Sequence, residues 1–399
     1  MERQTDWALT ERIDAAALLA RTQAWSAINS GTRNLAGLAA MAALLADDFA
    51  ALPGELSLIE GDEADSVGAD GSLTRLLHGR HLRLTVRPEA PVQMLFTGHM
   101  DTVYPADHAF QTLTWRDDTT LNGPGVADMK GGLSVMLEAL RVVEAAGMTQ
   151  LGYDVLINAD EETGSFSSAR LIAEAARGKQ AALTYEPALP DGTLAGARGG
   201  TGNFSILVSG RSAHAGRNPE DGRNAIVAAS EIALRLHDAR GPRLAVNPAR
   251  IDGGGPNNVV PDRAVLRVNF RPGDAGEIER ARTLVDAVTS QAAARHDVAV
   301  EVHGSFNRPP KPIDAGAARL FALVKGAGAA LDLNIVWRDT GGVCDGNNIA
   351  AAGVPVVDTM GVRGGAIHSS DEYLLVDSLA ERAALSALTI KRIAEGALL

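Results

Sequence analysis

The chain has 399 residues, of which 46% are hydrophobic and 22% charged, a composition typical of a folded protein with more than one domain. Its 37 lysines and arginines face 49 aspartates and glutamates, so the formal net charge is -12, which argues against binding to a nucleic-acid backbone. The single cysteine, Cys344, excludes an intramolecular disulfide framework and thiolate-rich zinc clusters. Any metal ligands must therefore be histidines or carboxylates.

The N-terminal stretch MERQTDWALTERIDAAALLARTQAW is charged and predicts an amphipathic helix. It lacks the basic segment, apolar segment and small-residue cleavage site of a secretory leader. No apolar run approaches the ~20 residues that a membrane-spanning helix needs. These features predict a cytoplasmic protein.

Further along the chain, apolar β-branched runs alternate with Ala- and Leu-rich helical patterns. Helices are expected at residues 34–49, 131–146, 167–176 and 315–329, and buried strands at VQMLFTG, YDVLINA, AALTYE and VPVVDTM. This alternation predicts an α/β domain in which helices cover both faces of a mainly parallel sheet.

The pattern changes between about Arg198 and Asn307, where the order of elements becomes β-α-β-β-α-β, as in ferredoxin-like folds. The segments ARGGTG and NRPPKP flank this region, and their glycines and prolines suit hinges. We therefore expect a catalytic domain of residues 1–197 and 308–399, interrupted by a small α+β domain of residues 198–307.

Residues that could bind a metal or act as a base follow the expected strands of the larger domain. Ligands of an open α/β sheet gather at the carboxyl ends of its strands, and the residues expected there are His99, Asp101, Asp128, Asp160, Glu161, Glu162, Glu186 and His368. Taken singly, each has an ordinary explanation, such as a helix cap for Asp128 or a solvated face for the acidic triplet. Their coincidence at one sheet edge favours a metal site.

Two imidazoles and three carboxylates suit zinc, with cobalt and manganese as alternatives. Five ligands can hold two ions if one carboxylate bridges them, as in two-metal hydrolases, and Asp128 is our choice for the bridge. The neighbours Glu161 and Glu162 could then divide the work, one binding metal while the other takes a proton from the attacking water.

Seven segments, GHMDTVYP, NGPGVADMKGG, ADEETGS, YEP, GRSAHAG, GPNNVVP and GGAIHSSDE, together resemble those of the di-zinc exopeptidase and deacylase family. That family includes glutamate carboxypeptidase, acetylornithine deacetylase, succinyl-diaminopimelate desuccinylase and aminoacylase. The likeness runs from about Ile28 to the C-terminus, and TVYP, DEETGS and YEP are most similar to the bacterial glutamate carboxypeptidase branch. It implies a zinc-dependent carboxypeptidase or, alternatively, an N-acyl-amino-acid deacylase.

The resemblance also implies a role for each site residue. The zinc ligands would be His99, Asp128 and Glu186 for one ion, and Asp128, Glu162 and His368 for the other. Glu161 would be the general base toward a water between the ions, and Asp101 would orient the imidazole of His99.

For the inserted domain, the resemblance implies a lid and a dimer contact. His214 would stabilise the oxyanion, often in the neighbouring subunit's site, while Asn258 and Arg271 would hold the substrate's α-carboxylate. A surface ion pair is the ordinary alternative for Arg271. Closure at the two hinges would bring these groups to the metals.

The sequence departs from the pattern of the family at two points. Cys344 stands where many relatives carry Ser or Thr, so it is a packing residue or a substrate contact. No lysine lies between Glu186 and His214, so a firm anchor for a glutamate side chain is not evident.

Two rival interpretations of the function remain. The segment GAGAAL at residues 326–331 partly imitates a nucleotide-binding motif, but it lacks the third glycine and follows a helical pattern. A catalytically silent binding protein on the same fold would predict a damaged base or ligand, whereas all are present.

Overall fold

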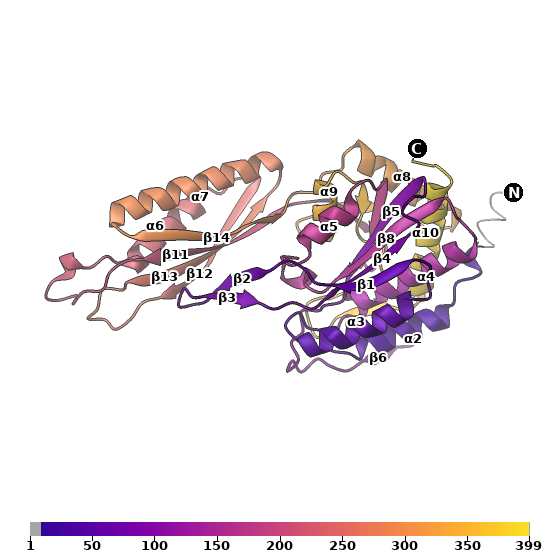
Figure 1. Cartoon of the computed structure of the whole chain (residues 1–399), viewed down its shortest axis with the longest axis horizontal. Helices are drawn as coiled ribbons and strands as arrows, with labels where there is room; N and C mark the ends of the chain where they lie inside the picture. The colour runs from indigo at the N-terminus through magenta and orange to yellow at the C-terminus, as the bar shows by residue number, and fades with distance from the viewer. Residues whose placement is uncertain (1–8, 399) are drawn as a thin grey trace.

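The computed structural model describes residues 9–398. Figure 1 shows a larger body, which contains the first and last helices of the described residues, and an elongated smaller body that extends from one side of it. Of the predicted N-terminal helix, residues 1–8 lie outside the described part, and the remainder includes helix α2 (Ala15–Ser26). Within residues 9–398, no helix has the length and apolar character needed to cross a membrane.

A six-stranded sheet forms the centre of the larger body, in the order β1-β4-β8-β5-β9-β16. Its strands are β1 (Glu55–Ile59), β4 (His81–Val86), β5 (Val92–His99), β8 (Leu151–Asn158), β9 (Ala181–Thr184) and β16 (Val356–Val357). The last four run parallel to one another, and β4 and β1 add an antiparallel edge. All eight residues of β8 are buried, as expected of a strand covered on both faces. The prediction of a mainly parallel α/β sheet is confirmed.

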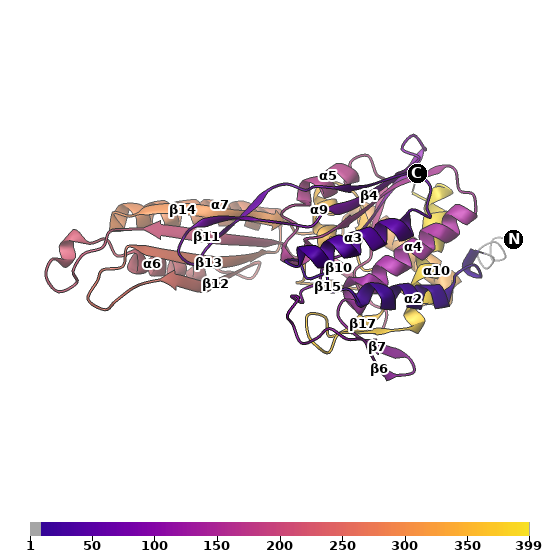
Figure 2. The same cartoon turned by 60° about the horizontal axis from the view of Figure 1, so that its bottom comes forward.

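Helices cover both faces of this sheet (Figure 2). Met94 and Phe96 of β5 join a core with α3 (Leu35–Phe49), α4 (Gly131–Ala145), α8 (Ala315–Ala330) and α10 (Asp377–Ala394). Leu95, which points the other way along the strand, packs with α5 (Ala169–Ala176) and α9 (Asp345–Ala351). Residues 326–330 lie within α8, so the glycine segment that resembled a nucleotide motif is helical and does not join a strand to a helix.

Two of the expected helices, α3 and α8, begin after a capping side chain. The carboxamide of Asn34 accepts a hydrogen bond from the Gly37 amide at the start of α3, and Asp314 accepts one from Ala317 at the start of α8. Each cap satisfies an amide that has no partner inside the helix. All four expected helices begin within two residues of their predicted positions.

Several short strands were not predicted. They are β2 (Ala64–Val67), β3 (Leu73–Leu76), β6 (Thr114–Asp117), β7 (Thr120–Asn122), β10 (Leu194–Arg198), β15 (Trp337–Thr340), β17 (Gly364–Gly365) and β18 (Tyr373–Leu375). The segment VPVVDTM, predicted as a full strand, contributes only the two residues of β16. A four-stranded accessory sheet in the order β17-β18-β7-β6 lies close to the candidate site.

The smaller body is an antiparallel sheet in the order β12-β13-β11-β14 with two helices and its own hydrophobic core. Its elements follow the predicted β-α-β-β-α-β order: β11 (Thr201–Ser209), α6 (Ala225–Asp238), β12 (Leu244–Gly253), β13 (Arg263–Pro272), α7 (Ala275–His296) and β14 (Ala299–Arg308). The β2–β3 hairpin reaches across from the larger body, and the guanidinium of Arg267 donates to the Val67 carbonyl over 2.7 Å.

Candidate metal centre and active site

A cleft of about 810 Å³ lies between the two bodies. Its walls include Asp128, Glu162, Glu186 and His368 from the larger body and strand residues such as Arg271 from the smaller one. His99 lies behind this wall and is 1% exposed. All five predicted metal ligands are therefore at or directly behind one cleft.

His99, at the end of β5, is the centre of the first group of ligands. Its Nε2 lies 3.1 Å from Oδ1 of Asp128 and 3.8 Å from a carboxylate oxygen of Glu186. Its Nδ1 lies 3.0 Å from the Asp101 carbonyl oxygen, which can only accept, so Nδ1 carries the proton. Nε2 is then free to bind a cation.

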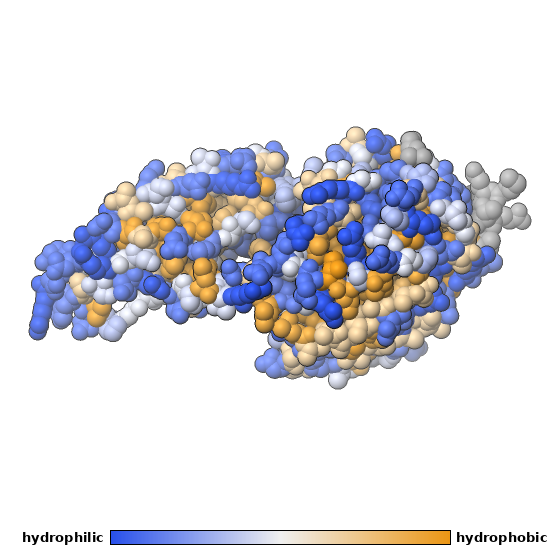
Figure 3. All heavy atoms as spheres, in the orientation of Figure 1, coloured by the Kyte–Doolittle hydropathy of each residue, from blue (hydrophilic) through white to orange (hydrophobic). Residues whose placement is uncertain are grey.

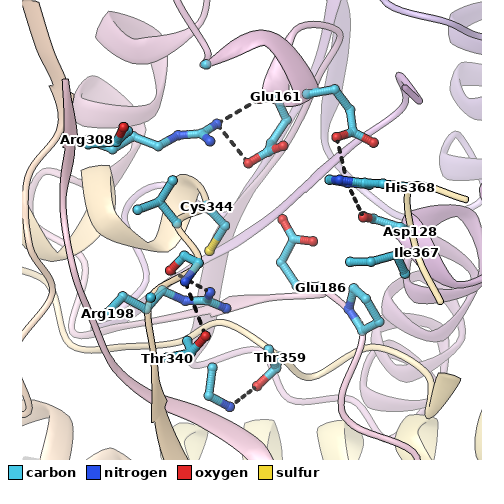
Figure 4. Close-up of a pocket in the computed structure, with 18 of the residues that line it drawn as sticks. Asp128, Glu161, Glu186, Arg198, Arg308, Thr340, Cys344, Thr359, Ile367 and His368 are labelled. Carbon is cyan, nitrogen blue, oxygen red and sulfur yellow. Dashed lines mark hydrogen bonds and ion pairs between the residues drawn. The ribbon is translucent and has the colours of Figure 1, made fainter. Parts of the chain in front are cut away.

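His368 is the centre of the second group. Its Nε2 lies 3.3 Å from Oδ2 of Asp128 and 3.2 Å from Oε2 of Glu162 (Figure 4). The ligand atoms of each group lie within 4.8 Å of one another. The two oxygens of Asp128 thus face different histidines, the arrangement required of a bridging carboxylate.

The sequence predicted that all of these residues lie at one edge of the main sheet. Two of them do not. His99, Glu162 and Glu186 do follow β5, β8 and β9. Asp128 instead lies in the turn after β7, and His368 lies in the loop between β17 and β18. The accessory sheet therefore places both Asp128 and His368 at the cleft.

The charges of the cluster fit a bound cation. Burial raises the pKa of Glu162 to about 7 and raises the pKa of Glu161 well above its usual value. Hydrogen bonds to Asp128 and Glu162 raise the pKa of His368 to about 11. Crowded carboxylates retain protons where no cation balances them, and a divalent ion would replace those protons. Nitrogen and oxygen donors without a thiolate suit zinc and related divalent metals.

Asp101 lies against His99, as predicted, and also contacts the turn that carries Glu161 and Glu162. Its carboxylate accepts hydrogen bonds from the amides of Glu161 and Glu162, over 3.1 and 3.2 Å, and from the Thr32 hydroxyl over 2.7 Å. The carboxylate is 3.4 Å from Nδ1 of His99, farther than the Asp101 carbonyl. Asp101 therefore contacts the imidazole of His99 through both its carbonyl and its carboxylate, while its carboxylate also holds the acidic turn of Glu161 and Glu162.

Two residues around the cluster were missed by sequence reasoning. Arg308 forms an ion pair with Glu161, with Nη2 2.7 Å from Oε1, yet its segment NRPPKP was interpreted only as a hinge. Glu372 accepts hydrogen bonds from the amides of Ala127 and Asp128, each with a distance of 3.0 Å. It therefore holds the turn that carries Asp128. Glu372 lies inside the segment GGAIHSSDE, and that position was the only signal for it.

The remaining predicted residues divide into two pairs. Arg271 and Cys344 line the cleft, and burial raises the pKa of the Cys344 thiol well above its usual value. His214 and Asn258 are exposed and are not among the lining residues. They lie in adjoining turns, where the Ala215 amide donates to the Asn258 carbonyl over 2.9 Å. One chain alone does not bring these two residues to the cleft.

Residues 95–392 match the sequence profile of peptidase family M20/M25/M40. The chain is 31% identical over 313 residues to carboxypeptidase G2 of Pseudomonas sp. (strain RS-16), covering 76% of this chain and 74% of that protein. It is 27% identical over 307 residues to succinyl-diaminopimelate desuccinylase of Verminephrobacter eiseniae, covering 72% and 75%.

Among solved structures, the chain resembles the YXEP protein of Bacillus subtilis, described as a dinuclear metal binding peptidase of the M20 family, with a TM-score of 0.64. The identity is 15%, and the match covers 96% of this chain and 98% of that one. This likeness shows the fold, while the sequence profile covers well over half of the chain. The chain therefore belongs to peptidase family M20/M25/M40, a family of metallopeptidases and related amide hydrolases.

Proposed function

We propose that this chain is a two-metal carboxypeptidase, with zinc as the metal, that releases an amino acid with a free α-carboxylate. The observation that carries the proposal is the division of Asp128 between two histidine-centred ligand groups directly beside Glu161. The dinuclear metal binding described for the Bacillus subtilis structure supports the same count. Two ions held there would supply Lewis-acid activation of a water and of the scissile carbonyl.

The chain's own residues would carry out the remaining steps. Glu161 lines the cleft and belongs to neither ligand group, so its carboxylate is free to take a proton from the attacking water and pass it to the departing nitrogen. Arg271 would hold the α-carboxylate of the substrate, since its Nε donates to Asn269 and leaves the other face of its guanidinium available.

A deacylase of N-acyl-amino acids is the second candidate, favoured by the desuccinylase relative and by Arg198. This arginine is one of two basic residues between Glu186 and His214, and it lines the cleft. Both of its contacts to Asp358, over 2.8 and 3.1 Å, belong to a bidentate ion pair. Because Asp358 already occupies the guanidinium of Arg198, we do not expect Arg198 to bind a glutamate side chain. The absence of such an anchor weakens the case for a strict glutamate carboxypeptidase and so favours the deacylase.

Metal analysis combined with a substrate panel tests the proposal. We expect about two divalent ions per chain, in line with a two-metal site, and hydrolysis of dipeptides or N-acyl-amino acids that stops on chelation and returns when zinc is added. Preference for dipeptides supports the carboxypeptidase, and preference for N-acyl-amino acids supports the deacylase. A protein without bound metal, whose activity is unaffected by chelation, would refute both.

We further propose that a second copy of the chain docks on the smaller body. Val227 and Leu234 lie seven residues apart on the outer face of α6 and are 49% and 64% exposed, and apolar side chains are visible on this body in Figure 3. The adjacent strand β12 is an edge of its sheet among the described residues, so its backbone is open to pairing. Such a dimer would allow His214 and Asn258 to reach the cleft of the other copy.

Changing Leu234 to glutamate is expected to convert a dimer into a monomer, because a charge would be placed in an apolar contact. Analytical ultracentrifugation measures the mass. Leu35→Glu is the matched control, since Leu35 is 37% exposed at the start of α3 on the larger body and the substitution should leave the mass unchanged. A monomeric wild-type chain, or a Leu234→Glu variant that remains dimeric, would contradict this contact.

A further inference from the structure

We propose that Arg308 is a positioning residue that holds the carboxylate of Glu161. Through Arg308, the position of this carboxylate depends on how the smaller body packs against the larger one. The inference rests on the proposed function, because it takes Glu161 as the general base. Arg308 is the last residue of β14, at the point where the chain leaves the smaller body, and its side chain is 6% exposed.

One nitrogen of Arg308 contacts the acidic turn at three points. Nη2 lies 2.7 Å from Oε1 of Glu161 and 2.9 Å from the carbonyl oxygen of the same residue (Figure 4). It also lies 2.8 Å from the Ser165 hydroxyl. The arginine therefore binds both the backbone carbonyl and the carboxylate of Glu161. A glutamate held at both ends has few rotamers left, which fixes the direction of its free oxygen.

The neighbouring carboxylate of Asp345 balances the buried charge without competing for this role. Its Oδ1 accepts from the Ser165 hydroxyl over 2.5 Å and lies 3.4 Å from Arg308. Its Oδ2 accepts from Asn158 over 2.6 Å. Since both oxygens of Asp345 have nearer partners, Glu161 is the carboxylate that Arg308 holds most closely.

The adjoining residues attach the end of β14 to the larger body. The Asn307 carboxamide donates to the Gly164 carbonyl over 2.8 Å, so two consecutive residues of the strand rest on the turn that carries Glu161. Beyond Pro309 and Pro310, Lys311 exchanges two backbone hydrogen bonds of 2.9 Å with Arg198, the residue at which the chain enters the smaller body. These contacts join the end of β14, and with it the smaller body, to the turn that carries Glu161.

The test compares Arg308→Ala and Arg308→Lys with the wild-type enzyme in its metal-loaded form. For Arg308→Ala we expect kcat to fall by about 10–100-fold, the usual cost of losing a residue that supports a metal site, with KM and metal content little changed. Added guanidinium, at concentrations that do not denature the wild type, should restore part of kcat. Hydrogen exchange of residues 159–165 should become faster in the variant, a readout that does not depend on activity.

The controls separate failure of this inference from failure of the proposed function. Glu161→Gln should lose activity and gain nothing from guanidinium, and Asn307→Ala, which keeps the arginine, should not respond to guanidinium either. If Glu161→Gln keeps its kcat, the proposed base is wrong. If Glu161→Gln loses its kcat while Arg308→Ala keeps the wild-type value, or if guanidinium restores nothing, only the role of Arg308 is overturned.

If the alanine variant fails to fold, the kcat and metal content of Arg308→Lys test the proposal without it. Lysine keeps the positive charge but not the planar fork of donors, so the variant should hold both metals while kcat falls. A lysine variant with wild-type kcat would overturn the proposal.

Discussion

Replacing Glu161 by glutamine is expected to lower kcat by about 10²–10⁴-fold, the usual contribution of a positioned general base. Glutamine has nearly the same shape and can still accept a hydrogen bond from Arg308 through its remaining oxygen. It cannot take up a proton at neutral pH. Because Glu161 belongs to neither ligand group, the variant should keep its metal content, which separates a defect in proton transfer from loss of the centre.

The measurement is kcat on the best substrate of the panel, together with metal content by elemental analysis. Glu174→Gln is the matched control: it makes the same chemical change on α5, where Glu174 pairs with the exposed Arg170, and Glu174 is not among the residues that line the cleft. That control should retain wild-type kcat. A Glu161→Gln variant with most of its activity would show that another group accepts the proton.

Local sequence signals were sufficient for the main elements of the fold. Val92–His99 and Leu151–Asn158 are apolar runs that a sheet buried on both faces requires, and Asn34 marks the start of its helix by a cap. Val356–Val357 is shorter than predicted because only two residues pair with β9. Strands such as Thr114–Asp117, all exposed, carry no periodic pattern that could reveal them.

The candidate site was predictable where it depends on strand ends and not where it depends on distant pairing. His99, Glu162 and Glu186 could be placed together because parallel strands end at one edge of a sheet. Arg308 meets the Glu161 backbone across 147 sequence positions, and Glu372 meets the Asp128 amide across 244. No local pattern encodes such contacts, so Arg308 and Glu372 could be identified beside Glu161 and Asp128 only from the three-dimensional structure.

Replacing Asp128 by asparagine is expected to have the largest effect on the metal centre. Each carboxylate oxygen of Asp128 faces a different histidine, with Oδ1 3.1 Å from His99 and Oδ2 3.3 Å from His368. Asparagine keeps one oxygen, but its amide group is a donor and cannot ligate a cation. We therefore expect a fall from two ions per chain to at most one and, since both ions take part in the proposed reaction, a loss of kcat at least as large as that of Glu161→Gln.

Metal content and thermal unfolding with and without added zinc measure this effect. A ligand that binds only the folded state raises its stability, so zinc should raise the Tm of the wild type more than that of Asp128→Asn. The turn itself should persist, because Glu372 holds the amides of Ala127 and Asp128 independently of the Asp128 side chain. Asp117→Asn, at an exposed aspartate of β6, is the control and should bind two ions. An Asp128→Asn variant that still binds two ions and shows the wild-type Tm shift would rule out Asp128 as the bridge, because a bridging ligand cannot lose one oxygen without loss at one of the two metals.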